Sequence, residues 1–264
     1  YAKDAQVAEL TTDADGKAVL KDLPLGKYKV VEKTAPEGFV LNSEEQNVQF
    51  VYVDQNTPVI VESTEFINDR QKVELSVVKK DAENDSVLAG AEFGLYAKED
   101  IKAGDKVIVK ADTQLSSAVT GKDGKAVFEQ DLPFGTYYVK ELTAPEGFVS
   151  SDEVIEVAAS YQGQDVEVVR LEEILKNQPT TTEFTKSDLT TGVELDGATL
   201  TVLDEDGNEI DPWTSVKGEP HVIKRLQAGK TYVLREEFAP YGYLKAEEVA
   251  FTVSDTAEVQ KVEM

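Results

Sequence analysis

Lysine, glutamate and asparagine side chains stand at positions that point toward the apolar side of expected strands. Successive residues of a strand point to opposite faces, so Lys79 shares a face with Leu75 and Val77. The same alternation places Glu141 and Asn177 on the apolar faces of two later strands. Desolvation lowers the pKa of a lysine and raises the pKa of a glutamate. Such a set could therefore supply a neutral amine nucleophile and a carboxylic acid.

Parts of the same set recur elsewhere in the chain. Glu32 and Asn68 lie as far apart as the glutamate and asparagine named above, and Lys186 and Glu236 occupy matching positions near the end of the sequence. Any one of these side chains alone could lie at a strand end and reach solvent. An unpaired buried charge is costly even after the protein relaxes around it. Their recurrence therefore predicts that each set is brought together in its own repeat.

Other catalytic or metal-binding sets are missing from the sequence. The chain has no cysteine, which excludes a disulfide framework and a thiolate metal site. His221 is the one histidine, so a multi-histidine metal site is impossible, and its Gly-Glu-Pro-His-Val context indicates a surface histidine near a turn. The acidic stretches at 13–16 and 204–207 do not fit the ligand spacing of a calcium loop, and we interpret them as hairpin turns. We expect no metal and no cofactor.

Internal repeats position these residues. The motif Tyr-x-x-x-Glu-x-x-Ala-Pro-x-Gly, followed by an aromatic residue, begins at Tyr28, at Tyr137 and, with more variation around it, at Tyr232. A Lys-x-Asp opening with a Gly-Ala pair farther on precedes the second and third copies, at Lys79 and Lys186. The first copy has no such opening. The repeats therefore predict three similar modules, the first of them incomplete.

The module boundaries follow from these repeats. Module one covers residues 1–69, module two covers 70–178 and module three covers 179–264. Module one begins with Tyr1-Ala-Lys3, which matches a later part of module two, so we expect it to lack its first strand. Module three ends about where a partner for Lys186 should follow, so we expect it to lack the end of its last strand. No leader or anchor segment is recognisable, and we expect an internal piece of a longer protein.

Almost every segment alternates apolar and polar residues and is rich in Val, Tyr, Phe and Thr. Such alternation is typical of half-buried strands, and Asp-Gly, Pro-Glu-Gly and Leu-Pro-Phe-Gly separate the segments as turns. Many short strands with frequent turns predict an all-β protein built of tandem antiparallel β-sandwiches. The stretch 98–120 is longer than its counterpart in module one. We interpret it as an extra hairpin rather than as a ligand-binding insertion.

With its Lys-x-Asp openings, Gly-Ala pairs and three Glu-x-x-Ala-Pro motifs, the sequence resembles the Cna B-type, or SpaA-type prealbumin-like, repeat domains of Gram-positive surface adhesins and pilins. The resemblance covers essentially the whole chain and implies tandem Ig-like sandwiches. In that family, a lysine on the first strand condenses with an asparagine or aspartate on the last strand, beside a glutamate on a middle strand.

The resemblance implies specific roles for the residues singled out above. In module two it implies an isopeptide bond between Lys79 and Asn177, with Glu141 as the catalytic proton shuttle. The other two modules have incomplete sets, because one partner is missing from the chain. The corresponding residues are the catalytic Glu32 with the bond candidate Asn68 in module one, and the catalytic Glu236 with the bond candidate Lys186 in module three.

The charge of the chain limits its partners. Lys and Arg number 27 against 51 Asp and Glu, which gives a formal net charge of −24. Such a chain is repelled by a phosphate backbone and by an anionic membrane surface. No apolar run approaches the roughly 20 residues that a membrane-spanning helix needs. We therefore expect no nucleic-acid partner and no membrane insertion in this segment.

Together these observations predict a structural stalk or backbone segment of a bacterial adhesin or pilin, whose only chemistry is single-turnover self-cross-linking. The expected partners are neighbouring pilin or adhesin modules, with host matrix or glycan reached through other parts of the parent protein. We expect an extracellular location on a parent protein anchored to the cell wall. Two alternatives remain. The first alternative is a host-ligand-binding adhesin module, which would need an exposed aromatic patch or groove. The second is an accessory domain of a secreted enzyme, which would need catalytic residues other than the lysine, glutamate and asparagine set.

Overall fold

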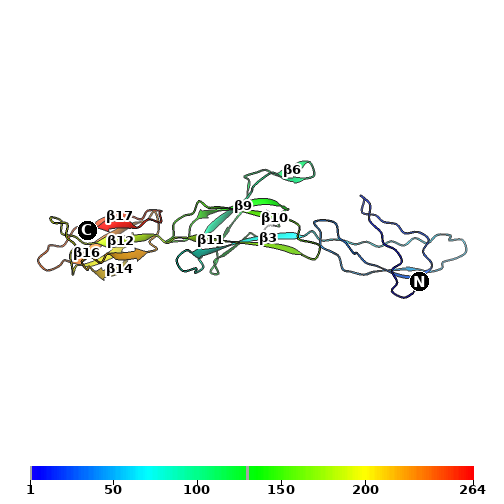
Figure 1. Cartoon of the computed structure of the whole chain (residues 1–264), viewed down its shortest axis with the longest axis horizontal. Coiled ribbons are helices and arrows are strands. Elements are labelled where there is room, and N and C mark those ends of the chain that lie inside the picture. Colours follow the sequence, from blue (N-terminus) through cyan, green and yellow to red (C-terminus); the bar gives the residue numbers. More distant parts are fainter. Residues whose placement is uncertain (1, 129–130) are drawn as a thin grey trace. The chain divides into compact units, whose positions relative to one another are not determined.

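The computed structural model describes residues 2–128 and 131–264, and all regular elements within these ranges are β-strands (Figure 1). The all-β class predicted from the alternation is confirmed. The chain divides into two compact units. The first unit comprises Tyr1–Gln71 with Gly163–Glu167, and the second comprises Lys72–Gln162 with Val168–Met264.

Module two has two sheets around one core. The fully buried side chains of Leu75, Phe93 and Tyr137 come from both sheets, as the alternation of each strand requires. The first sheet has the order β11 (Val168–Asn177), β3 (Lys72–Asp81), β8 (Lys125–Phe128). The second has the order β10 (Val154–Ala159), β9 (Gly135–Thr143), β4 (Glu92–Ala97), β7 (Gln114–Val119).

The first and last strands of module two run parallel, unlike the antiparallel pairs that surround them. Strand β3 pairs with β11 from Lys72 opposite Val168 to Asp81 opposite Asn177, and β8 covers its other edge in antiparallel orientation. The parallel pair is possible because the chain between these two strands is long enough to build the second sheet. Strand β3 is therefore central. The extra hairpin predicted in the 98–120 stretch is present as β5 (Ile101–Ala103) and β6 (Lys106–Val109).

Module three repeats this arrangement. Its buried core includes Phe184, Leu200 and Leu234, and the only tryptophan, Trp213, packs against it. The first strand again lies in the middle, antiparallel to one neighbour and parallel to the last strand. The first sheet has the order β15 (His221–Lys224), β12 (Thr181–Thr185), β18 (Gln260–Glu263). The second has the order β14 (Glu209–Thr214), β13 (Thr199–Leu203), β16 (Thr231–Phe238), β17 (Val249–Thr252).

Module one has fewer strands than its repeats suggest. Its described residues form one two-stranded sheet, β1 (Gly26–Val30) with β2 (Gln46–Phe50). Residues 17–20 and 59–68 match β8 and β11 in sequence but form no strand. In module two both of those strands pair with β3. Module one has no counterpart of β3 among its described residues, so neither segment has a ladder to join. Apolar side chains such as Val19 and Val61 are consequently exposed.

Modules two and three, which lie in the same unit, meet at the loop that follows β9. Gly147 in this loop has a φ of 79°, a left-handed conformation that favours glycine. A Cβ at this position would lie 2.5 Å from the carbonyl oxygen of Arg225. The Gly147 carbonyl accepts a hydrogen bond of 3.1 Å from the amide of Thr180, whose hydroxyl donates to the carbonyl of Leu226. The two modules are therefore in close backbone contact here.

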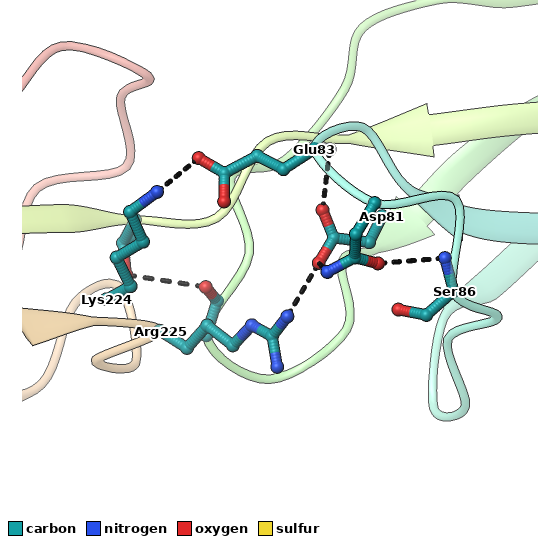
Figure 2. A network of polar contacts seen from close by, with 8 residues as sticks. Asp81, Glu83, Ser86, Lys224 and Arg225 are labelled. Carbon is teal, nitrogen blue, oxygen red and sulfur yellow. Dashed lines mark hydrogen bonds and ion pairs between the residues drawn. The ribbon is translucent and has the colours of Figure 1, made fainter.

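Charged side chains join the same two modules (Figure 2). Arg225 Nη2 lies 2.7 Å from Asp81 Oδ2, and the Asp81 side chain is fully buried. The same carboxylate accepts hydrogen bonds from the Glu83 amide and from Asn84 Nδ2. Lys224 Nζ lies 2.5 Å from Glu83 Oε1, but both of these side chains reach solvent. The Asp81–Arg225 pair is therefore the stronger of the two electrostatic contacts.

The Arg225→Gln variant tests the contribution of this pair. The change removes the guanidinium from a buried carboxylate, so we expect the contact between modules two and three to weaken by about 1–3 kcal/mol. Amide hydrogen exchange in residues 82–86 and 146–149 should accelerate accordingly. The matched control is Lys224→Gln, which removes an exposed pair worth about 0–1 kcal/mol. Equal exchange in the two variants would contradict the ranking.

Candidate functional site

The lysine, glutamate and asparagine of module two come from three strands and meet between the two sheets. Lys79 lies on β3 and Asn177 is the last residue of β11, in the first sheet. Glu141 lies on β9 in the second sheet, opposite Phe93 of β4. In the β3–β11 register Lys79 stands opposite Leu175, so Asn177 lies two residues beyond it. The structure thus brings together all three residues that the alternation placed on apolar faces.

The glutamate of this site contacts both other members. Lys79 Nζ lies 2.9 Å from Glu141 Oε1, and the two side chains are 0% and 1% exposed. Asn177 Nδ2 lies 3.0 Å from each carboxylate oxygen of Glu141. The Asn177 side chain is also buried, and its Oδ1 accepts no hydrogen bond from the described residues. An amine and a primary amide are therefore held against one carboxylate, away from water.

Burial changes the acid–base properties of the lysine. Desolvation lowers the pKa of Lys79 from its ordinary value of 10.5, and the nearby carboxylate of Glu141 opposes this shift. Lys79 Nζ also lies over the ring of Phe93, 5.4 Å from the ring centroid. A lowered pKa makes the neutral, nucleophilic form of an amine more abundant at a given pH.

A backbone amide that the sequence analysis missed holds each glutamate. Glu141 Oε2 accepts a hydrogen bond of 2.9 Å from the amide of Ser151, which lies ten residues later. The corresponding glutamates, Glu32 and Glu236, accept bonds from residues at the same separation. The Ala-Pro-x-Gly turn reverses the chain and returns it to the glutamate. The fixed distance from that turn to the glutamate is the sequence signal that could have revealed the contact.

Module three has the same lysine–glutamate pair. Lys186 Nζ lies 3.5 Å from Glu236 Oε1, and the two side chains are 7% and 0% exposed. Thr185 pairs with Glu263 on the last strand, so the register sets Lys186 opposite Met264, just as Lys79 stands opposite Leu175. The position that matches the asparagine of module two therefore lies two residues beyond Met264.

Module one has the glutamate–asparagine half of the set. Asn68 Nδ2 donates to Glu32 Oε2 at 2.6 Å and also to the carbonyl of Val40 at 2.9 Å. The amide of Asn42 donates to the same carboxylate oxygen. Among the described residues, no strand of module one corresponds to β3, which supplies the lysine in module two. The three glutamates thus occupy equivalent places, and within residues 2–128 and 131–264 only the glutamate of module two has both partners.

Other kinds of site are not evident in the described residues. Within residues 2–128 and 131–264, no group of three or more His, Asp or Glu side chains could hold a metal ion. In the same ranges, no helix is long and apolar enough to cross a membrane. His221 stacks on Trp213 and contacts Asp211 through Nε2 at 2.9 Å, so it belongs to a local ring and carboxylate contact.

Modules two and three each have two sheets, parallel first and last strands, and a lysine–glutamate pair buried between the sheets. This combination defines a class of tandem prealbumin-like β domains. The chain belongs to the SpaA family of prealbumin-like fold domains, whose model matches residues 1–65, 73–173 and 180–264. The resemblance noted in the sequence is thereby confirmed. No curated protein matches the chain in sequence.

Several solved structures are similar to this chain. The Bacillus anthracis TIE protein has 26% sequence identity and a TM-score of 0.61, over 97% of this chain and 44% of that one. The chain therefore spans less than half the length of that protein. A Streptococcal ancillary pilin has 23% identity and a TM-score of 0.33, over 91% of this chain and 75% of that one. The shaft pilin SpaA from Lactobacillus rhamnosus GG has 16% identity and a TM-score of 0.32, over 73% of this chain and 96% of that one.

The lowered pKa of Lys79 predicts a pH-dependent stability. In the Asn177→Ala variant the amine has no amide to react with, and the unfolded lysine binds a proton that the folded lysine gives up at lower pH. Stability should therefore rise with pH between the lowered pKa and 10.5, by at most about 1.4 kcal/mol per pH unit. Thermal unfolding across this range measures the slope. Adding Lys79→Met to the same variant should remove this contribution, and an unchanged slope would contradict the assignment.

Proposed function

We propose that this chain is a structural stalk segment of a bacterial cell-surface adhesin or pilin, in which module two is locked by an internal Lys79–Asn177 isopeptide bond. The observation that carries the proposal is the buried contact of Lys79 and Asn177 with one carboxylate, Glu141. The same glutamate position recurs in modules one and three. Repeated modules built around one self-modifying site fit a structural role better than an enzymatic one.

The bond-forming step follows from the contacts. The neutral amine of Lys79 attacks Cγ of Asn177, a Cγ–Nζ bond forms, and the Cγ–Nδ2 bond breaks. One amine proton is transferred to Nδ2, so that ammonia leaves and a secondary amide remains. Glu141 lies within hydrogen-bond reach of both nitrogens and can relay this proton. Because the fold holds the reactants together, much of the entropic cost of bringing them into contact is already met.

The product also improves the energetics of the core. An amide replaces the buried ammonium group, so the desolvation that lowers the pKa of Lys79 no longer acts on a charged nitrogen. The reaction occurs once in each molecule, and no substrate is turned over. This supports a self-processing structural protein rather than an enzyme or an enzyme's accessory domain.

The surroundings of such a segment are extracellular. We infer a place on the bacterial cell surface, in a parent protein anchored to the cell wall, next to other pilin or adhesin modules. Membership of the SpaA family of prealbumin-like fold domains supports this. Host matrix or glycan would be contacted by other parts of the parent protein. The alternative, in which these modules bind a host ligand themselves, needs an exposed groove or aromatic patch dedicated to that ligand.

Intact mass spectrometry tests the bond directly. We expect the 264-residue chain to weigh less than its sequence mass by one ammonia, because only module two has a complete set. A proteolytic digest should contain a branched peptide that joins Lys79 to Asn177. A full sequence mass with an unmodified Lys79 peptide would refute the bond. A loss of two ammonia molecules would show that Lys186 or Asn68 has found a partner within this chain.

The Glu141→Gln variant tests the proton relay. The replacement keeps the shape of the side chain but removes the acid, so the link should form at least about 100-fold more slowly while module two remains folded. The extent of linking is measured by intact mass at increasing times after refolding. The matched control is Glu153→Gln, which changes an exposed carboxylate that acts on Lys79 only through space. Linking of Glu141→Gln at the rate of this control would exclude a catalytic role for Glu141.

A further inference from the structure

One end of module three exposes a group of apolar side chains. Leu189 and Tyr241 are fully exposed, Leu244 is 94% exposed and Tyr243 is 46% exposed. Hydrogen bonds from Thr191 are the main reason that the pKa of the Asp188 carboxyl is lowered, and Tyr243 adds to this shift, so the loops that carry Asp188 and Tyr243 are neighbours. We call these four apolar side chains the apolar face of module three, and Asp188 is its neighbouring carboxylate. Contiguous exposed apolar side chains mark interaction sites more often than isolated ones do.

The equivalent loops of module two can be identified from their backbone hydrogen bonds. The amide of Asp188 donates to the carbonyl of Val193, and the amide of Asp81 donates in the same way to the carbonyl of Ser86. Both aspartates lie two residues after the site lysine of their module. The Ala-Pro-x-Gly motifs likewise set residues 240–244 against residues 145–149. The apolar face therefore corresponds to the surface of module two that contacts module three.

The two equivalent surfaces differ in whether they are covered. In module two, module three covers the loop 145–149. The side chain of Phe148 is therefore only 5% exposed, whereas the equivalent Tyr243 is 46% exposed. A Cβ on Gly147 would collide with Arg225, whereas a Cβ on the equivalent Gly242 would meet nothing within 4 Å. Both glycines have positive φ, so the two loops share a left-handed conformation at this position, but only the loop of module two is covered.

The side chains of the open surface are also more apolar than those of the covered one. In the order of the chain, Leu189, Tyr241 and Leu244 stand where module two has an alanine, a glutamate and a valine. At the covered surface, the buried carboxylate of Asp81 contacts the guanidinium of Arg225. Asp188 offers a carboxylate at the equivalent position.

We propose that the apolar face of module three docks a further module of this fold, one that sets a basic side chain against Asp188 as Arg225 is set against Asp81. A second copy of this chain is a poor fit. Asp22 of module one matches Arg225, since both have positive φ and both precede a leucine. Stacking module one on the apolar face would therefore oppose Asp22 to Asp188, two like charges.

An extended chain tests the proposal. A second copy of residues 176–264 is joined after Met264, which preserves the register because Met264 matches Leu175. The copy of Asn177 in this extension is changed to alanine, so no covalent link to Lys186 can contribute, and the outcome is independent of the cross-linking proposed above. The appended copy brings its own Arg225 to the apolar face. Amide exchange in residues 188–192 and 240–244 should slow about tenfold or more relative to the 264-residue chain.

Charge variants show whether the basic side chain matters. Arg225→Asp in the appended copy should restore fast exchange at the apolar face, and combining it with Asp188→Arg should slow exchange again. Protected amides in the appended β13 and β16 show that the added copy is folded. Unchanged exchange beside a folded copy would overturn the proposal, as would equal protection with and without Arg225→Asp. Self-association of the 264-residue chain through this face would overturn the choice of a basic module as partner.

Discussion

The arrangement of modules two and three depends on burying a lysine and a glutamate between two sheets. Two desolvated charges are tolerated because they lie against each other and because a backbone amide also holds the glutamate. The requirement explains the repeated motif. The strand that contains the motif tyrosine also carries the glutamate. The Ala-Pro-x-Gly turn then reverses the chain, so that a backbone amide ten residues later binds this glutamate. The first strand must then run through the middle of its sheet, where its lysine is buried.

The central position of the first strand also explains module one. In the other two modules that strand has a neighbour on each side, so its backbone groups complete two ladders. Among the described residues, module one has no first strand with which residues 17–20 and 59–68 could pair. These two segments therefore form no strand. The second-sheet pair β1–β2 and the Glu32–Asn68 contact do not depend on the first strand, and both are present.

Local periodicity was enough to predict the all-β class and the inward direction of Lys79, Glu141 and Asn177, because strand parity is fixed by neighbours in the sequence. The parallel pairing of β3 with β11 could not be predicted in this way, since it depends on how two distant segments align. The Asp81–Arg225 contact was missed for a related reason: each residue looks like an ordinary charged turn residue until the other module is beside it. The proposed Lys79–Asn177 bond stays a prediction.

The parallel alignment of β3 and β11 has a mechanical consequence. Tension along the chain would enter module two at Lys72 and leave it at Asn177, the opposite ends of two strands that run side by side. Their hydrogen bonds would then be loaded in shear, all together, rather than opened one after another like a zipper. A covalent bridge from Lys79 to Asn177 would carry the force past the whole intervening chain. Residues 80–176 would then bear no tension and would stay folded while the segment was pulled.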